Sequence, residues 1–521
     1  MRTSFLKYVW VFVAVLGLLP ACEDLEDTYS DYTGDGPVQY LTKIYDLQGE
    51  PKWLSVLLTW ELKLDPGRTA ILVEWTDDST TYSQVIDKDA RDFMITGLKN
   101  YEYACSVKAI EQKDGEVIGK SIGDPVYVRP FTYASEELTL FSQVVRKAYQ
   151  VAGKKLFVLF EPWADNLISF QVGYFEKGNA TEKFWTVEKV NNLPDGKVYA
   201  MIGENVDFTK PINVYRKGRI ASIDNMELEL QPVPLYFETP MFDAAFAAEV
   251  RSRLDLIGEI KQSDINDVEV LDIDYDQLSL VDVLHFPNLK ELHLGRNRLL
   301  AAGTENVVKS VLTNQEESVA ALEGIAGELG VKIYHYGNHY FNTVPDFFTA
   351  KNQVAELPEF SLLNTVGWDI TVNPMDAMGY NSGLANLLQE SDAYWSPQAS
   401  EILRKHIIEI DMKESKRILG FKVGQAMTPP ADVQTPDVLD IEFETGSGAW
   451  ESAAFSRSVT VGTGKGETTI IYLDKSHSVK TAQKIRVTVA DKFHKKGYNA
   501  SYAYVDFYTV VLSSFMVIEG N

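Results

Sequence analysis

Residues 53–64 read WLSVLLTWELKL, a run in which apolar side chains recur at every second position. Side chains alternate between the two faces of a β-strand, so this spacing predicts a strand with one buried face. A second alternating run follows the turn at residues 65–67, and a third contains Tyr103 and Cys105. The residues expected to face inward in the first two runs are Leu54, Val56, Leu58, Trp60, Leu62, Leu64, Ile71, Val73 and Trp75. Several short strands at this spacing are typical of a β-sandwich.

Similar alternation recurs through most of the chain, so the sequence predicts a multidomain, mainly β protein. The chain has 521 residues, which is more than one hydrophobic core usually supports. Its formal net charge of −25 disfavours nucleic acid and anionic membrane as partners, because both would repel it. Cys22 and Cys105 are the two cysteines. We expect no disulfide, because Cys22 is assigned to a lipid below and Cys105 is interpreted as a buried apolar residue.

Two N-terminal sandwiches are predicted. Residues 95–109 read ITGLKNYEYACSVKA and resemble the later strands of a fibronectin type III domain, with Tyr103 near that family's tyrosine corner. The resemblance implies one sandwich over residues 37–133. Alternating strands predict a second, similar sandwich over residues 134–234, with Trp163 and Trp185 in its core.

A 21-residue repeat follows these two blocks. Val268, Leu271, Ile273, Asp276 and Leu278 are matched by Leu289, Leu292, Leu294, Asn297 and Leu299. The second copy resembles a leucine-rich repeat, whose asparagine bonds the backbone at each turn. The resemblance implies adjacent parallel strands, one more unit near Ile333, and a helix around residues 319–329, all within residues 235–345. A chance amphipathic strand–helix pair is the alternative, and residues 346–360 are expected to be a linker.

The last segment, residues 361–521, returns to strands. It contains HIIEID at 406–411, ILGF at 418–421 and KIRV at 484–487. With the turn at Asn386 and with Trp395, these runs resemble a discoidin domain, the β-sandwich of coagulation-factor C domains and family 32 carbohydrate-binding modules. The resemblance implies a sugar site in loops at one end of the sandwich. It also raises a structural calcium ion as an alternative, for which the sequence assigns no ligands, and no other cofactor is expected.

Sugar recognition needs an aromatic face for the C–H groups of the ring and a few polar groups for its hydroxyls. We expect those groups to come from loops of the last segment. The candidate ligand-binding residues are Trp368, Asp369, Glu390, Asp392, Tyr394, Phe493, His494 and Tyr498. For each aromatic candidate the alternative is packing in the interior of the domain.

Catalytic motifs are scarce, since the sequence contains neither Gly-x-Ser-x-Gly nor His-Glu-x-x-His. Residues 462–467 read GTGKGE, which lacks the spacing of a phosphate-binding loop and is interpreted as a hairpin tip. His335 and His339 are four residues apart, but no third metal ligand is near them in the sequence. The sequence therefore predicts a non-catalytic protein, with a hydrolase of unrecognised active site as the alternative.

The first 22 residues read MRTSFLKYVWVFVAVLGLLPAC. A short basic region precedes an apolar run too short to span a bilayer, which predicts a cleaved signal peptide over residues 1–21. The ending Leu-Pro-Ala-Cys resembles a bacterial lipobox and implies acylation of Cys22; a chance cysteine is the alternative. Residues 22–36 are expected to form an acidic tether, and residues 23–27 resemble the export tag on surface lipoproteins of glycan-foraging gut Gram-negative bacteria. A merely solvated linker is the alternative there.

Together the resemblances imply a lipid-anchored outer-membrane protein that is exposed at the cell surface and meets the membrane only through its lipid. Its expected partner is a glycan or glycoconjugate, with other outer-membrane uptake proteins as further candidates. The alternative is an adhesion or scaffold protein that binds another protein through the repeat region. The sequence names neither the glycan nor the oligomeric state.

Overall fold

The computed structural model describes residues 40–521 except 140, 142, 163–164, 188–197, 238–241, 305–309, 338–339, 353–354, 377–382, 431–432 and 455–456. The predicted signal peptide, Cys22 and the acidic tether therefore lie outside the described residues. None of the helices within the described ranges has the length and apolar character needed to cross a bilayer. The chain divides into two compact units, Met1–Phe141 with Arg219–Leu230, and Ser142–Gly218 with Gln231–Asn521.

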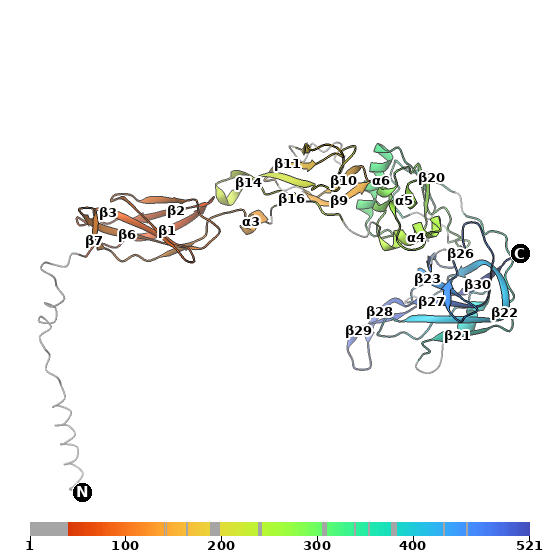
Figure 1. Cartoon of the computed structure of the whole chain (residues 1–521). Helices are drawn as coiled ribbons and strands as arrows, with labels where there is room; N and C mark the ends of the chain where they lie inside the picture. The colour runs from red at the N-terminus through yellow and green to blue at the C-terminus, as the bar shows by residue number, and fades with distance from the viewer. Residues whose placement is uncertain are drawn as a thin grey trace, which may run out of the picture. The chain divides into compact units, whose positions relative to one another are not determined.

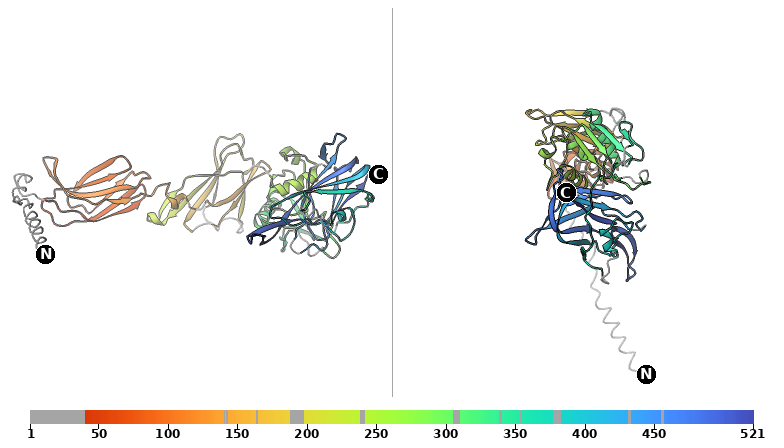
Figure 2. Two further views of the ribbon diagram at one scale, coloured as in Figure 1. Left: turned by 90° about the horizontal axis from the view of Figure 1, so that it is seen from below. Right: turned by 90° about the vertical axis from the view of Figure 1, so that its right-hand side faces the viewer.

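The first unit contains a β-sandwich of two sheets, seen from two directions in Figures 1 and 2. One sheet has the order β1-β2-β5, and the other has the order β4-β3-β6-β7 with β8 also paired to β6. The strands are β1 (Tyr45–Lys52), β2 (Ser55–Glu61), β3 (Ala70–Thr76), β4 (Thr81–Asp87), β5 (Asp92–Thr96), β6 (Tyr103–Lys113), β7 (Glu116–Lys120) and β8 (Val126–Val128). The unit also holds α3 (Glu136–Thr139), η3 (Ala221–Ile223) and β15 (Met226–Glu229).

The alternation predicted for residues 53–64 is confirmed in its centre and wrong at its ends. Val56, Leu58 and Trp60 are buried in the core, whereas Leu54 and Leu64 are exposed. Leu54 precedes β2 with a left-handed φ of 50°, and Leu64 follows the end of β2 at Glu61. The two-residue period therefore holds only within the strand itself.

Tyr103 and Cys105 take the structural roles expected of them. The Tyr103 hydroxyl accepts a 3.1 Å hydrogen bond from the backbone N–H of Lys99, which is the contact of a tyrosine corner. Cys105 is fully buried, and burial raises the pKa of its thiol to about 12. The thiol is therefore protonated and unreactive at neutral pH.

The second unit begins with another pair of sheets. β13, β10 and β9 pair in that order, and β12-β11-β14 form the other sheet with β16 on β14. These strands are β9 (Val145–Val151), β10 (Lys155–Phe160), β11 (Leu167–Tyr174), β12 (Lys183–Val187), β13 (Tyr199–Ile202), β14 (Asn213–Ile220) and β16 (Val233–Pro234). Trp185 stacks on Phe160, with ring centroids 5.7 Å apart, as its predicted core role requires. Trp163 lies outside the described residues.

The repeat region follows, and its four short strands pair side by side in parallel. The elements are α4 (Ala244–Leu254), α5 (Gln262–Ile265), β17 (Val270–Ile273), η4 (Val281–His285), β18 (Glu291–Leu294), α6 (Gln315–Glu328), β19 (Lys332–Tyr336) and β20 (Thr349–Lys351). Leu271 pairs with Leu292, and Leu292 pairs with Ile333, so the parallel strands predicted from the repeat are confirmed. The linker predicted over 346–360 is wrong in part, because β20 adds a fourth strand beside β19.

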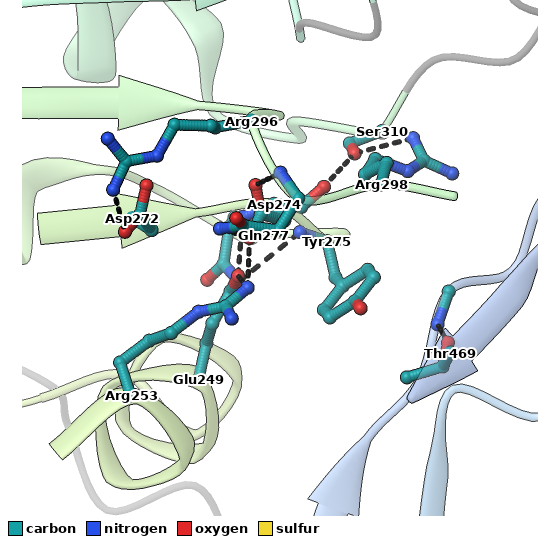
Figure 3. Close-up of polar contacts among 12 residues, drawn as sticks. Glu249, Arg253, Asp272, Asp274, Tyr275, Gln277, Arg296, Arg298, Ser310 and Thr469 are labelled. Atoms are coloured by element: carbon teal, nitrogen blue, oxygen red, sulfur yellow. Dashed lines mark hydrogen bonds and ion pairs between the residues drawn. The ribbon is translucent and has the colours of Figure 1, made fainter. Parts of the chain in front are cut away.

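Buried polar side chains hold the turns that follow these strands (Figure 3). The fully buried carboxylate of Asp274 accepts hydrogen bonds from the backbone N–H of Asn297 at 2.9 Å and from its side-chain amide at 3.0 Å. Glu249 of α4 accepts the Tyr275 N–H at 3.3 Å and the Gln277 side-chain amide at 2.9 Å. Asn297 thus donates to the carboxylate of Asp274 in the preceding turn. The leucine-rich-repeat resemblance implies an asparagine that bonds the backbone of each turn, but here Glu249 accepts one of these backbone N–H groups.

The C-terminal module, residues 361–521, is a β-sandwich built around the long strand β22. Its main sheet has the order β21-β22-β27-β23-β24, with β25 on β23 and both β26 and β30 on β22. The elements are β21 (Asp369–Asn373), η5 (Leu384–Leu388), β22 (Lys405–Gly424), β23 (Val438–Glu444), β24 (Trp450–Ser452), β25 (Ser458–Thr460), β26 (Thr468–Tyr472), β27 (Lys480–Ala490), β28 (Lys492–Tyr498), β29 (Tyr504–Thr509) and β30 (Ser514–Glu519). The predicted fold class, multidomain and mainly β, is confirmed.

The predicted hairpin tip at residues 462–467 lies between β25 and β26, but it is partly buried against the repeat region. Arg298 and Glu467 form an ion pair whose side chains are 1% and 0% exposed. Arg298 Nε donates to Glu467 at 2.7 Å and its terminal nitrogen donates to Ser310 at 2.8 Å. The turn therefore serves as an internal contact of the second unit.

Candidate functional site

The candidate site lies on the hairpin formed by β28 and β29, which extends beyond the body of the C-terminal module in Figure 1. The sequence places Phe493, His494 and Tyr498 in a loop, but all three belong to strand β28. The reason is pairing in register with β29, in which Phe493 lies opposite Tyr508 and Tyr498 lies opposite Tyr504.

Buried polar contacts fix the base of this hairpin. Asp491, the residue before β28, is buried and receives a 2.6 Å contact from His406 Nε2 and a 3.3 Å hydrogen bond from Arg404 Nε. Trp395 packs edge-on against the ring of His406, with centroids 5.4 Å apart. Lys492 then pairs with Asp437 at 2.5 Å. These contacts orient the first residue of the hairpin relative to the sandwich.

A second chain segment supports the side of the hairpin. Ser400 and Tyr508 exchange two backbone hydrogen bonds, of 2.9 and 2.7 Å. Near the turn, the side-chain amide of Asn499 donates to Glu401 at 2.9 Å. The segment between Trp395 and Arg404 therefore lies beside β29 and limits the movement of the strand.

One face of the hairpin carries three cross-strand pairs. Residues that pair directly across two antiparallel strands point to the same side of the hairpin. The register shift between Phe493 and Lys495 adds one residue to β28, so that Phe493, Lys496 and Tyr498 share one side. The pairs are Phe493 with Tyr508, Lys496 with Asp506, and Tyr498 with Tyr504. We call these six residues the hairpin face.

The hairpin face is aromatic at both ends and charged in the middle. The rings of Tyr498 and Tyr504 are 5.1 Å apart and are 70% and 62% exposed, and those of Phe493 and Tyr508 are 6.2 Å apart. Between them Lys496 Nζ lies 3.9 Å from Asp506 Oδ1. The face thus offers exposed rings beside one donor and one acceptor, which is the combination that a sugar requires.

Trp368 and Asp369 lie at the start of β21, away from the hairpin. Asp369 is opposite Asp411 in β22, whereas the start of β22, Lys405, is opposite Ala490 and hence next to the hairpin. Trp368 is half-buried against the module core, and Asp369 forms an ion pair with Lys413. The structure does not bring these two residues to the hairpin face.

Glu390, Asp392 and Tyr394 form a third group on the turn after η5. Glu390 and Asp392 are exposed and Tyr394 is half-buried. Glu390 forms an ion pair with Lys422. This turn is held to the start of β30, where the Ser513 hydroxyl donates to the carbonyls of Ser391 and Ala393 at 2.9 Å. The eight predicted residues are therefore divided among three places.

Sequence reasoning identified Phe493 and Tyr498 but missed the other four residues of the hairpin face. Tyr504, Asp506 and Tyr508 recur at every second position and would have indicated a strand, had the turn at residues 499–503 been recognised. The turn is held by Asn499, whose side-chain oxygen accepts hydrogen bonds from the backbone N–H groups of Ser501 and Ala503, both at 3.0 Å. Asparagine commonly forms such turns, so the pattern was available in the sequence.

Metal binding finds little support in the described ranges. They contain no group of three or more His, Cys, Asp or Glu side chains placed to hold a metal ion. His335 is buried and packs against Phe348, with ring centroids 6.0 Å apart, while His339 lies outside the described residues. We therefore assign neither a catalytic metal nor calcium ligands.

Comparisons with known proteins give one family and several solved structures to which parts of this chain are similar. A family described as a domain of unknown function matches residues 22–199. No curated protein matches the sequence. Among solved structures, the chain is similar to a two-domain fibronectin type III segment of chicken tenascin, at 16% identity over 38% of this chain and 99% of that chain, with a TM-score of 0.18.

Two further solved structures resemble the chain. One is the C-terminal domain of a chitobiase from Bacteroides fragilis, at 15% identity over 31% of this chain and 100% of that one, with a TM-score of 0.23. The other is a family 32 carbohydrate-binding module of C. perfringens NanJ in complex with galactose, at 10% identity, 29% and 93% coverage and a TM-score of 0.20. The structural neighbours are fibronectin type III and family 32 module domains.

Proposed function

We propose that this chain is a non-catalytic protein that captures carbohydrate on the hairpin face. The observation that carries the proposal is the exposed, closely spaced ring pair of Tyr498 and Tyr504. Aromatic faces bind the C–H groups of sugar rings, and exposed rings at an ordered hairpin need little rearrangement to do so. The sequence resemblance of residues 361–521 to discoidin domains supports the same function.

The charged pair in the middle of the face supplies orientation. Lys496 can donate to a sugar hydroxyl and Asp506 can accept from one, since neither is fully buried. Such an open face excludes little water, so we expect weak binding by a single site, with a Kd in roughly the millimolar to high-micromolar range.

A glycan array with the protein lacking residues 1–22 tests the proposal. The wild type should bind a subset of glycans, and Tyr498→Ala and Tyr504→Ala should each reduce that binding at least about tenfold. Tyr127→Ala, which removes a tyrosine of similar 65% exposure on the first unit, serves as the matched control and should bind normally. Equal binding by wild type and both hairpin variants would refute the role of the face.

The proposed location is the outer surface of the outer membrane, with acyl chains on Cys22 as the anchor. Each buried CH₂ group contributes about 0.8 kcal/mol to membrane binding, so Cys22→Ala should release the protein from the membrane fraction. Deleting residues 23–27 should retain the lipid but reduce cleavage by external protease. Wild-type levels of Cys22→Ala in the membrane fraction would contradict lipid anchoring.

A second candidate function is protein binding by the face of the repeat-region sheet on which Asp272 and Tyr334 are half-buried and His293 is buried. Asp272, His293 and Tyr334 lie side by side on neighbouring strands, and the rings of His293 and Tyr334 stack with centroids 4.8 Å apart. Arg296 pairs with Asp272 at 2.6 Å, as Figure 3 shows. If this face binds an uptake protein or adhesion partner, Tyr334→Ala should abolish co-purification of that partner while glycan binding is retained.

A further inference from the structure

A cavity of about 530 Å³ lies apart from the hairpin face, within the second unit. It lies between strand β9 of the second sandwich and the starts of α4 and α6 in the repeat region, and η4 forms part of its wall. A volume of this size is typical of sites for small molecules. None of the six residues of the hairpin face lines it.

Two buried carboxylates belong to the polar part of the cavity wall. Glu317, 5% exposed, receives a hydrogen bond from the Tyr149 hydroxyl and lies 3.0 Å from Lys147 Nζ. Asp282 is also buried and accepts the Asp243 N–H at 2.7 Å. Both carboxylates lie in the cavity wall, where hydroxyl groups of a ligand can reach them as hydrogen-bond donors.

Apolar and aromatic side chains form the rest of the wall. Tyr149, Tyr236, Phe237 and Phe242 line the cavity together with Leu278. Tyr236 and Leu278 are exposed, while Phe242 is buried, so the aromatic lining extends from the surface into the interior. This arrangement offers ring faces on one side of a ligand and acceptors on the other.

The charges of the lining indicate the class of ligand. The cavity is lined by the basic Arg146 and Lys147 and by the acidic Asp243, Asp282 and Glu317. An anion would be repelled by the buried carboxylates, whereas Lys147 already compensates the charge of Glu317 and so weakens the attraction for a cation. A neutral ligand rich in hydroxyl groups avoids the repulsion and can use donors and acceptors alike.

We propose that this cavity is a second ligand site and that it binds a short neutral saccharide. The aromatic side chains contact the C–H faces of the sugar, and Glu317 and Asp282 accept hydrogen bonds from its hydroxyls. Because the cavity encloses more of the ligand than the hairpin face does, it contributes the tighter of the two sites. The inference shares its ligand class with the proposed function, but it depends on different residues.

The experiment uses the double variant Tyr498→Ala/Tyr504→Ala of the full chain lacking residues 1–22, so that the hairpin face is inactivated. Saturation-transfer-difference NMR with lactose, cellobiose, maltose and N,N′-diacetylchitobiose detects any remaining sugar binding. Leu278→Trp is added to fill the entrance of the cavity. Val311→Trp, at an exposed apolar residue of the same region that does not line the cavity, is the matched control.

We expect at least one sugar to bind the hairpin-inactivated protein, Leu278→Trp to weaken that binding at least about tenfold, and Val311→Trp to leave it unchanged. Asp282→Asn should weaken it as well while thermal unfolding stays cooperative. No binding by any of the four sugars in the hairpin-inactivated protein would overturn the inference, as would binding that survives Leu278→Trp. If Leu278→Trp abolishes all binding and the hairpin variants abolish none, the cavity site stands and the proposed function of the hairpin face fails.

Discussion

The contact around Arg298 and the hairpin face use the same kinds of side chain to opposite effect. Both place a basic residue against an acidic one, yet Arg298 and Glu467 are buried and hydrogen-bonded while Lys496 and Asp506 lie 3.9 Å apart at the surface. In the first region every charged group is directed at another part of the chain. In the second, charge and aromatic surface are left open to solvent. The difference shows what separates structural residues from candidate binding residues. It is less the type of residue than whether the side chain is buried and already has hydrogen-bond partners within the chain.

Electrostatics explains why the two pairs should differ in strength. Attraction between charges grows as water is excluded, but removing each charge from water costs free energy. The main effect of a buried ion pair is therefore seen when one partner is removed, because the other charge is left buried without compensation. A solvent-exposed pair is screened by water and salt and contributes little. The comparison can therefore be tested by removing one acidic partner from each pair.

The largest effect is expected for Glu467→Ala. The substitution leaves the buried Arg298 guanidinium without its carboxylate, which should lower the free energy of unfolding by about 3–5 kcal/mol. Urea denaturation monitored by circular dichroism measures the change. A loss below about 1 kcal/mol, as for a surface pair, would show that the buried pair is not needed for stability.

A smaller loss is expected when Ser318→Ala removes a buried hydroxyl from the repeat region. Ser318 Oγ accepts the Leu280 N–H at 2.9 Å and donates to the Asn314 carbonyl at 2.7 Å. The variant leaves a buried N–H without that acceptor, which should cost about 1–3 kcal/mol. Ser447→Ala, at an exposed turn, is the control, and an equal effect of both changes on denaturation would contradict the argument.

The pH dependence of stability gives a third test. Burial lowers the pKa of His335 below its ordinary value of 6.5. The unfolded chain therefore binds a proton at a higher pH than the folded chain does, so this residue reduces stability as the pH falls below about 6.5. Denaturation of wild type and His335→Phe at several pH values should show a flatter decline in the variant. Parallel curves would show that His335 does not contribute.

The smallest change in stability is expected on the hairpin face. Tyr498→Ala alters an exposed side chain and Asp506→Ala removes one partner of a half-exposed ion pair, so each should shift the free energy of unfolding by no more than about 1 kcal/mol. Thermal unfolding followed by circular dichroism checks this. A marked fall in the melting temperature of Tyr498→Ala would favour the alternative that the tyrosine serves packing.

The sequence predicted the elements whose pattern is local. Val56, Leu58 and Trp60 alternate within one strand, and the spacing of Leu271 and Leu292 predicted their parallel pairing. It missed β20, because a three-residue strand with exposed side chains has no hydrophobic pattern. It also missed the burial of Glu467, since its partner Arg298 lies 169 residues away in the sequence.

The candidate site was predicted only in part for a similar reason. Phe493 and Tyr498 were identified from their aromatic character, but the register that places Tyr504 and Tyr508 beside them depends on hairpin pairing. Trp368 and Tyr498 both belong to the C-terminal module, yet Trp368 precedes β21 of the main sheet, whereas Tyr498 lies in the separate sheet of β28 and β29. Composition can nominate binding residues, whereas only the fold decides which of them share a surface.

The pairing at the two ends of the C-terminal module has a consequence for protein engineering. The Leu363 N–H donates to the Val517 carbonyl at 2.9 Å and the Glu519 N–H donates to the Ser361 carbonyl at 2.8 Å, so the first and last residues of the sandwich are neighbours. Domains whose ends meet tolerate being reconnected or inserted into another chain. Joining these ends with a short glycine-rich linker and opening the exposed turn at residues 446–448 should yield a circular permutant that still folds. Because Glu467 of the module is buried against Arg298 of the repeat region, the permutant should be more stable with that region attached than alone.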